Sequence, residues 1–105
     1  MIFIETKTFT KRITALMSDE EYREVQVELI HTPTKGKIIK GSKGLRKLRC
    51  QASGRGKRGG ARIIYYYMVD EVRVHMLLAY SKNEQEYLTK DQIKILSKLM
   101  QEELL

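Results

Sequence analysis

The spacing of hydrophobic residues in the first third of the chain changes from strand-like to helical. The apolar run at residues 1–5 predicts a short strand, and apolar residues spaced three or four apart within 9–16 predict a short helix. A longer helix is expected over residues 18–30. Ser18 and Glu21 form a capping-box pattern that satisfies free amides at its start, and a proline follows its end. This part of the chain therefore predicts one strand followed by two helices.

Short β-prone runs separated by turns replace the helical spacing from residue 37 onward. Strands are expected at residues 37–39, 45–50, 62–69 and 72–80. Side chains alternate between the two faces of a strand, so Lys47 and Arg49 should share one face while Leu48 points to the other. By the same rule Tyr66 should share a face with Arg62. The short connections predict antiparallel hairpins.

The run at residues 72–80 follows a turn at Asp70 and Glu71 and alternates regularly. Strict alternation places four apolar residues on one face of this strand: Val72, Val74, Met76 and Leu78. His75 then falls on the opposite face, where we expect it to be exposed to solvent.

Two capping-box patterns precede the last apolar stripe, one at Ser81 with Glu84 and one at Thr89 with Gln92. A C-terminal helix is expected from apolar residues at helical spacing, namely Ile93, Leu96, Met100 and Leu104. The order β-α-α-β-β-β-β-α predicts a single α+β domain over residues 1–105. Two N-terminal helices would pack on a curved, mainly antiparallel sheet, with a C-terminal helix in addition.

Charge is distributed unevenly along this chain, whose formal net charge is +7. Residues 31–69 contain no Asp or Glu, and their cations are Lys35, Lys37, Lys40, Lys43, Arg46, Lys47, Arg49, Arg55, Lys57, Arg58 and Arg62. Uncompensated like charges repel one another, so this segregation indicates a surface that binds a polyanion such as RNA. Beside the strand cations, the expected RNA-binding residues are Arg46, Arg55, Lys57 and Arg58.

Other chemistries lack the residues that they need. Gly54, Gly56 and Gly59 match a dinucleotide-binding pattern, but a strand-like run follows them instead of the required helix. One cysteine and two distant histidines give no metal-ligand cluster, so neither a metal nor another cofactor is expected. The apolar runs are too short for a membrane span or a secretion signal, which predicts a cytoplasmic protein without a membrane partner.

Tyr80, at the exit of the last predicted strand, adjoins Lys82 and Asn83. An aromatic ring beside cations can stack on an unpaired base, as RNA-binding proteins commonly do. The sequence therefore predicts that this corner of the molecule contacts RNA.

The chain resembles the HigB branch of the RelE/ParE toxin superfamily in four segments: SDEEYREVQVEL at 18–29, GLRKLR at 44–49, GKRGGARIIYY at 56–66 and YSKNE at 80–84. The resemblance covers nearly the whole chain. It implies the toxin of a type II toxin–antitoxin system, a ribosome-dependent endoribonuclease encoded beside a helix-turn-helix antitoxin of the HigA type. The implied partners are mRNA in the ribosomal A site, ribosomal RNA and this antitoxin.

Enzymes of this family cut RNA without a metal, by attack of a ribose 2′-hydroxyl on the adjacent phosphate. The resemblance implies that Lys47 and Arg49 are the paired basic residues before the loop, and that Arg62 opens the strand after it. Some relatives carry a basic pair where this chain has Lys82 and Asn83, so Asn83 departs from their pattern. The implied catalytic set is Lys47, Arg49, Arg62, Lys82 and Tyr80, with Asn83 as an RNA contact.

Two alternatives of other classes stay open at this stage. A ParE-like protein inhibits DNA gyrase, and the basic set of Lys47, Arg49 and Arg62 argues against it. A non-catalytic RNA-binding protein would bind translating ribosomes without cutting mRNA. For the nuclease, a lysine acting as base needs a pKa of about 7 instead of its usual value of about 10.4. Cations desolvated together can lower it, so we expect little activity on free RNA, where the cluster is solvated.

Overall fold

The structure is a computed structural model that describes residues 1–52 and 60–103. Its elements are β1 (Ile2–Glu5), α1 (Lys7–Leu16), α2 (Asp19–His31), β2 (Lys37–Ile38), β3 (Arg46–Cys50), β4 (Ala61–Met68), β5 (Arg73–Ser81) and α3 (Lys90–Glu103). This order confirms the predicted succession of elements. Of the expected helix positions, Leu104 lies outside the described residues.

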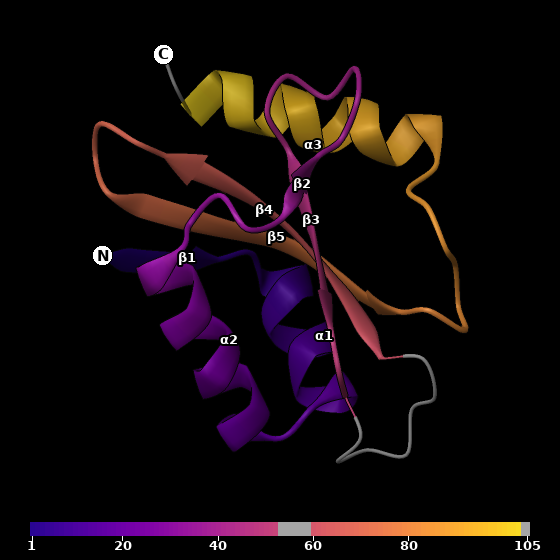
Figure 1. The fold of residues 1–105 in the computed structure, drawn as a ribbon. Coiled ribbons are helices and arrows are strands. Elements are labelled where there is room, and N and C mark those ends of the chain that lie inside the picture. Colours follow the sequence, from indigo (N-terminus) through magenta and orange to yellow (C-terminus); the bar gives the residue numbers. More distant parts are fainter. Residues whose placement is uncertain (53–59, 104–105) are drawn as a thin grey trace.

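The strands form one five-stranded sheet in the order β1-β5-β4-β3-β2. Neighbouring strands are antiparallel except for β1, which pairs with β5 in parallel. The two N-terminal helices carry the chain from β1 at one edge of the sheet to β2 at the other (Figure 1). The predicted mainly antiparallel sheet is confirmed.

The N-terminal helices begin at side chains that cap their free amides. The Thr6 hydroxyl accepts a hydrogen bond from the Phe9 amide at 3.0 Å at the start of α1. At the start of α2, the Glu21 amide donates to the Ser18 hydroxyl, and the Ser18 amide donates to the Glu21 carboxylate. This reciprocal pair is the predicted capping box, and caps of this kind stabilise a helix by about 1 kcal/mol.

Hydrophobic cores lie on both faces of the sheet. On one face, α1 and α2 bury Phe9, Ile13 and Leu29 against Ile63 and Tyr65 of β4. On the other face, α3 buries apolar side chains against the alternate residues of the same strand, with Met100 and Leu88 packed near Ile64 and Tyr66. Figure 1 shows the sheet between these helical layers. The predicted alternation along β4 is therefore confirmed.

The predicted alternation along β5 is wrong beyond its first half. The β4–β5 register shifts between Ile64 and Tyr65, so Ile64 pairs with Leu78 while Tyr65 pairs with Met76. The shift inserts one extra residue and turns Leu78 toward the α3 core, whereas Val74 and Met76 pack on the α1–α2 side. A bulge of this kind cannot be seen in an alternating sequence.

Two further local predictions are corrected by the packing. His75 is 94% buried, because α3 covers the face of β5 that was expected to meet solvent. Val72 belongs to the turn before β5, with a positive φ of 51°, and not to the strand. Ser81 and Glu84 exchange the predicted hydrogen bonds, but these close a turn. The reciprocal bonds between Thr89 and Gln92 are the ones that cap α3, which begins at Lys90.

The loop before β2 is held against the sheet from the α2 side. The Tyr65 hydroxyl donates to the Pro33 carbonyl at 2.7 Å and accepts from the Gly36 amide at 2.9 Å. A Cβ atom at Gly36 would lie 2.7 Å from the Tyr65 ring, closer than real contacts allow, so glycine is required there. These contacts fix where β2 meets β3.

Candidate functional site

Polar side chains form a row across three strands on the face of the sheet that also carries α3. In the strand register, Arg49 of β3 lies opposite Arg62 of β4, which lies opposite Tyr80 of β5. Ile64 and Tyr80 belong to the core under α3, and alternation puts Arg62 on their face. Lys47 lies opposite Ile64, one side chain further along β3. We call Lys47, Arg49 and Arg62 the cation row.

Arg62 is the most buried member of the cation row, with 5% of its surface exposed. Its Nη1 atom donates to the Ala61 carbonyl at 3.3 Å, and its Nη2 atom lies 3.8 Å from a carboxylate oxygen of Glu86. A charge removed from water needs a counter-charge, and Glu86 supplies one. The planar guanidinium fork is equally suited to two oxygens of a phosphate.

Tyr80 forms the floor of the row and is 98% buried, so its ring cannot stack on a base. The prediction that it provides a stacking surface is therefore wrong, because Tyr80 belongs to the hydrophobic core on the α3 face of the sheet. Its hydroxyl is buried and, among the described residues, has no hydrogen-bond partner. Burial raises the pKa of Tyr80, the positive charge of Arg62 opposes this, and Glu86 adds to it. At neutral pH this hydroxyl is a proton donor.

Lys47 has a lowered pKa, mainly because it is partly desolvated. The neighbouring charges of Arg49, Arg62 and Lys37 lower the pKa further, while Glu86 acts in the opposite direction. Its ammonium nitrogen lies 4.6 Å from the centre of the exposed Tyr87 ring, a cation–π contact. The direction of the shift is the one that a lysine base requires.

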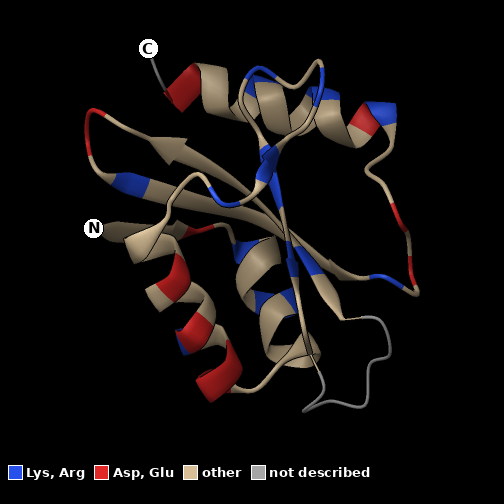
Figure 2. Cartoon of the chain, in the orientation of Figure 1, with Lys and Arg blue, Asp and Glu red and all other residues tan. Residues whose placement is uncertain are grey.

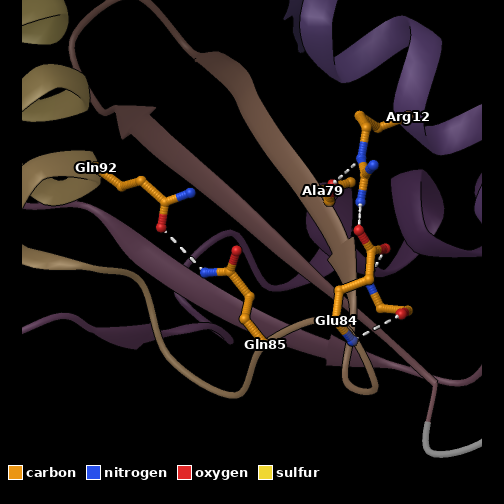
Figure 3. A network of polar contacts seen from close by, with 6 residues as sticks. Arg12, Ala79, Glu84, Gln85 and Gln92 are labelled. Atoms are coloured by element: carbon orange, nitrogen blue, oxygen red, sulfur yellow. Dashed lines mark hydrogen bonds and ion pairs between the residues drawn. The ribbon is translucent and has the colours of Figure 1, made fainter.

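The segment between β5 and α3 carries Glu86 and Tyr87 to the cation row, and polar contacts hold its start in place (Figure 3). From α1, Arg12 donates to the Ala79 carbonyl at 3.1 Å and forms an ion pair with Glu84. This contact lowers the pKa of Glu84 to about 2. Further along, Gln85 donates to Gln92 at the start of α3 at 3.0 Å. Both ends of the segment are thus attached to helices.

Lys82 and Asn83 are exposed where β5 ends. The Lys82 amide donates to the Gly60 carbonyl at 3.1 Å, which brings this end of β5 next to the start of β4. Gly60 has a φ of +77°, and a Cβ there would lie 2.1 Å from the Cys50 carbonyl oxygen. A glycine at this crowded position therefore lets β3, β4 and the end of β5 come together at the row.

Opposite charges separate between the two sides of the molecule. Figure 2 shows Lys and Arg along β3 and the segments beside it, and Asp and Glu concentrated on α2. A long polyanion is therefore attracted to the β3 side and repelled by α2. This distribution fits the charge segregation seen in the sequence.

No protein-family model matches this sequence. Among solved structures, Escherichia coli toxin RelE, as a free mutant with two arginines changed to alanine, aligns at a TM-score of 0.57 and 15% identity. The alignment covers 81% of this chain and 86% of that chain. The intact E. coli RelBE toxin–antitoxin complex aligns at a TM-score of 0.56 and 16% identity, over 76% of this chain and 94% of that chain. The chain has the RelE fold.

Within the RelE fold of this chain, Arg46 lies apart from the cation row. Its Nη1 atom donates to the Gly36 carbonyl at 2.8 Å and to the Thr34 carbonyl at 3.2 Å, on the α2 side of the sheet. Arg46 therefore fastens the loop before β2, and its expected contact with RNA stays a prediction. The other predicted loop cations, Arg55, Lys57 and Arg58, lie outside the described residues, as do Gly54, Gly56 and Gly59.

Sequence reasoning missed Glu86 and Tyr87. Glu86 is a carboxylate beside Arg62, and Tyr87 is the aromatic ring that Lys47 contacts, with 69% of its surface exposed. Both follow the last strand in a segment without apolar periodicity, so neither pattern nor spacing indicated where they would lie. The only sequence signal for Tyr87 was that it is an aromatic residue close in the chain to Tyr80 and Lys82, which were already candidates.

The remaining candidates for chemistry are accounted for by packing. Burial raises the pKa of the Cys50 thiol to about 12, despite the nearby charges of Arg62 and Lys35. In the part of the chain that the structure describes, His, Cys, Asp and Glu form no group of three that could hold a metal ion. Within residues 1–52 and 60–103, no helix has the length and apolar character needed to cross a membrane.

Proposed function

We propose that this protein is the toxin of a type II toxin–antitoxin system and cleaves mRNA on translating ribosomes. The observation that carries the proposal is the cation row itself. A buried arginine, a second arginine and a lysine of lowered pKa lie together on the neighbouring strands β3 and β4 of a RelE-type sheet. The likeness to E. coli RelE supports the assignment at the level of the fold.

Each residue of the cation row has a different role in a 2′-hydroxyl attack. Lys47, in its neutral form, accepts the proton of the ribose 2′-hydroxyl while the oxygen bonds to the adjacent phosphorus. Arg62 and Arg49 stabilise the negative charge that develops on the phosphate oxygens. The bond to the 5′-oxygen of the next nucleotide then breaks, and that oxygen takes a proton. Lys82, exposed at the β5 end of the row, is the candidate donor, whereas the buried Tyr80 hydroxyl could donate only if substrate binding uncovered it. The products carry a 2′,3′-cyclic phosphate and a 5′-hydroxyl.

Glu86 supports the expected dependence on the ribosome. In the free protein its carboxylate lies where Arg62 would meet a phosphate, and its charge keeps the pKa of Lys47 from falling further. Free RNA must therefore compete with this internal anion, whereas the ribosome presents mRNA in a fixed position. Outlying cations and polar groups would contact mRNA and ribosomal RNA: Arg46, Arg55, Lys57, Arg58 and Asn83. Such a target places the protein in the cytoplasm.

An antitoxin partner is part of the proposal. The RelBE structure is a toxin–antitoxin complex of E. coli, and this chain aligns with 94% of one of its chains. The sequence resemblance to HigB points to a helix-turn-helix partner of the HigA type. Binding of this partner is expected to suppress mRNA cleavage.

Cleavage of a defined mRNA in a purified translation reaction tests the function. Arg62→Ala should lower cleavage at least 100-fold, because the removed cation stabilises the transition state by several kcal/mol. Arg23→Ala, at an exposed arginine of α2, is the matched control and should cut like the wild type. Intact mRNA with all three proteins would contradict the nuclease assignment. Inhibition of DNA gyrase, or ribosome binding without cleavage, would then identify the alternative.

A further inference from the structure

A hollow of about 440 Å³ opens beside the cation row, between β2, β3 and the segment that carries Tyr87. Resting on the proposed function, we propose that it is a subsite for one unpaired RNA nucleotide next to the cleaved phosphate. The base would stack against Tyr87, and its phosphate would meet Lys37 of β2 and the nearby Lys40 and Lys47. A volume of this size falls in the range of small-ligand sites.

The lining combines exposed apolar surface with a single sign of charge. Tyr87 and Ile38 are 69% and 53% exposed, an unusual degree for large hydrophobic side chains at one site. The charged residues among its lining are all cations: Lys35, Lys37, Lys40, Lys47 and Arg49. Of these, Lys35 already pairs with Glu28, so Lys37, Lys40 and Lys47 are the main anion contacts. An aromatic face beside lysines is the combination that holds an unpaired base and its phosphate.

The hollow is built by the strand register. Pairing between β2 and β3 covers only Lys37 with Lys47 and Ile38 with Arg46, while β3 continues to Cys50. Two hydrogen bonds draw the chain before β2 to the opposite side: the Gly36 amide donates to the Tyr65 hydroxyl, and Arg46 donates to the Gly36 carbonyl. This leaves the edge of β3 beyond Lys47, at Leu48 and Arg49, without a strand partner from β2, and the hollow lies along it.

Lys47 connects this subsite to the proposed chemistry. It lines the hollow, lies against the Tyr87 ring and stands in the cation row. A nucleotide held here is therefore a direct neighbour of the phosphate that Arg62 and Arg49 would bind. Bases inside a duplex have both faces covered by their neighbours, so stacking on Tyr87 selects single-stranded RNA.

Binding of a short single-stranded oligonucleotide with 2′-deoxyribose, which cannot be cleaved, tests the subsite in the isolated protein. Ile38→Asp places a carboxylate in the hollow and should weaken binding at least 10-fold by fluorescence anisotropy. Tyr87→Leu should weaken it about 5- to 100-fold, as expected for the loss of one stacked base, whereas Tyr87→Phe should bind like the wild type. The control is Ile95→Asp, a residue of α3 that is 66% exposed.

The outcomes separate this proposal from the nuclease function. Equal binding by Ile38→Asp, Tyr87→Leu and the wild type, or no binding by the wild type, would overturn the subsite even if mRNA is cleaved on ribosomes. An oligonucleotide lacking one base that binds as tightly as the intact one would also overturn it, because the hollow would then hold only phosphate. Weakened binding in both variants, without any mRNA cleavage by the wild type, would retain the subsite and refute the nuclease.

Discussion

At the residue scale, alternation along a strand predicted which side chains form the cation row but not how deeply each of them is buried. Lys47 and Arg49 share a face of β3, and Arg62 lies opposite Arg49, as the pattern requires. Tyr80 has the right place in the register, yet it is core, because burial depends on which helix lies above a strand. The position of Glu86 beside Arg62 could not be predicted, since it depends on the path of an irregular segment.

Removing the charge of Glu86 should make the Arg62 guanidinium more available to a phosphate and should change the pKa of Lys47. Glu86 raises the pKa of Lys47, so Glu86→Gln should lower that pKa further. More of the lysine is then neutral at a given pH, and the rising limb of the pH–rate profile of mRNA cleavage should move to lower pH. Glu102→Gln, an exposed carboxylate on α3, is the control. A strong loss of cleavage in Glu86→Gln would show instead that Glu86 itself takes part in the reaction.

At the element scale, the helices and hairpins follow from local signals, whereas the packing of α3 does not. The capping pairs at Ser18 and Thr89 begin α2 and α3 as predicted. No sequence pattern indicated which sheet face α3 covers, and its position on this face buries His75. In addition, Ser97 of α3 donates to the Ser42 carbonyl in the turn before β3 at 2.7 Å. The C-terminal helix thus holds together the strands that carry the site.

His75 should make the packing of α3 sensitive to acid. Burial lowers its pKa from 6.5, with Arg73 acting in the same direction and Glu103 and Glu71 against it. Between the lowered pKa and about 6.5 the unfolded chain binds a proton that the folded chain does not, so stability falls as pH decreases through this window. The free energy of unfolding, measured with urea, should decrease more between pH 7.5 and pH 5.5 for the wild type than for His75→Leu. The control is His31→Leu, at an exposed residue at the end of α2, which should lose as much stability as the wild type. An equal loss in His75→Leu would contradict this assignment.

At the scale of the whole molecule, charge segregation was the most informative property of the sequence. It indicated a polyanion-binding surface before any element was placed. Among the described residues, most of those cations lie along β3 and its neighbours, although Lys35 pairs with Glu28 of α2. Composition alone did not show that the cations border a hollow, since this depends on the short register of β2. Nor did it show that Glu86, a carboxylate from outside the basic segment, lies next to Arg62.

Cleavage by 2′-hydroxyl attack can be tested at the cut itself. After the main cleavage position has been mapped on a translated mRNA, the same mRNA is made with a single 2′-deoxynucleotide on the 5′ side of that position. Attack by the 2′-hydroxyl predicts that cleavage is lost at this position and continues at the others, with 2′,3′-cyclic phosphate ends on the products of the unmodified mRNA. Undiminished cleavage at the 2′-deoxynucleotide would contradict the proposed mechanism.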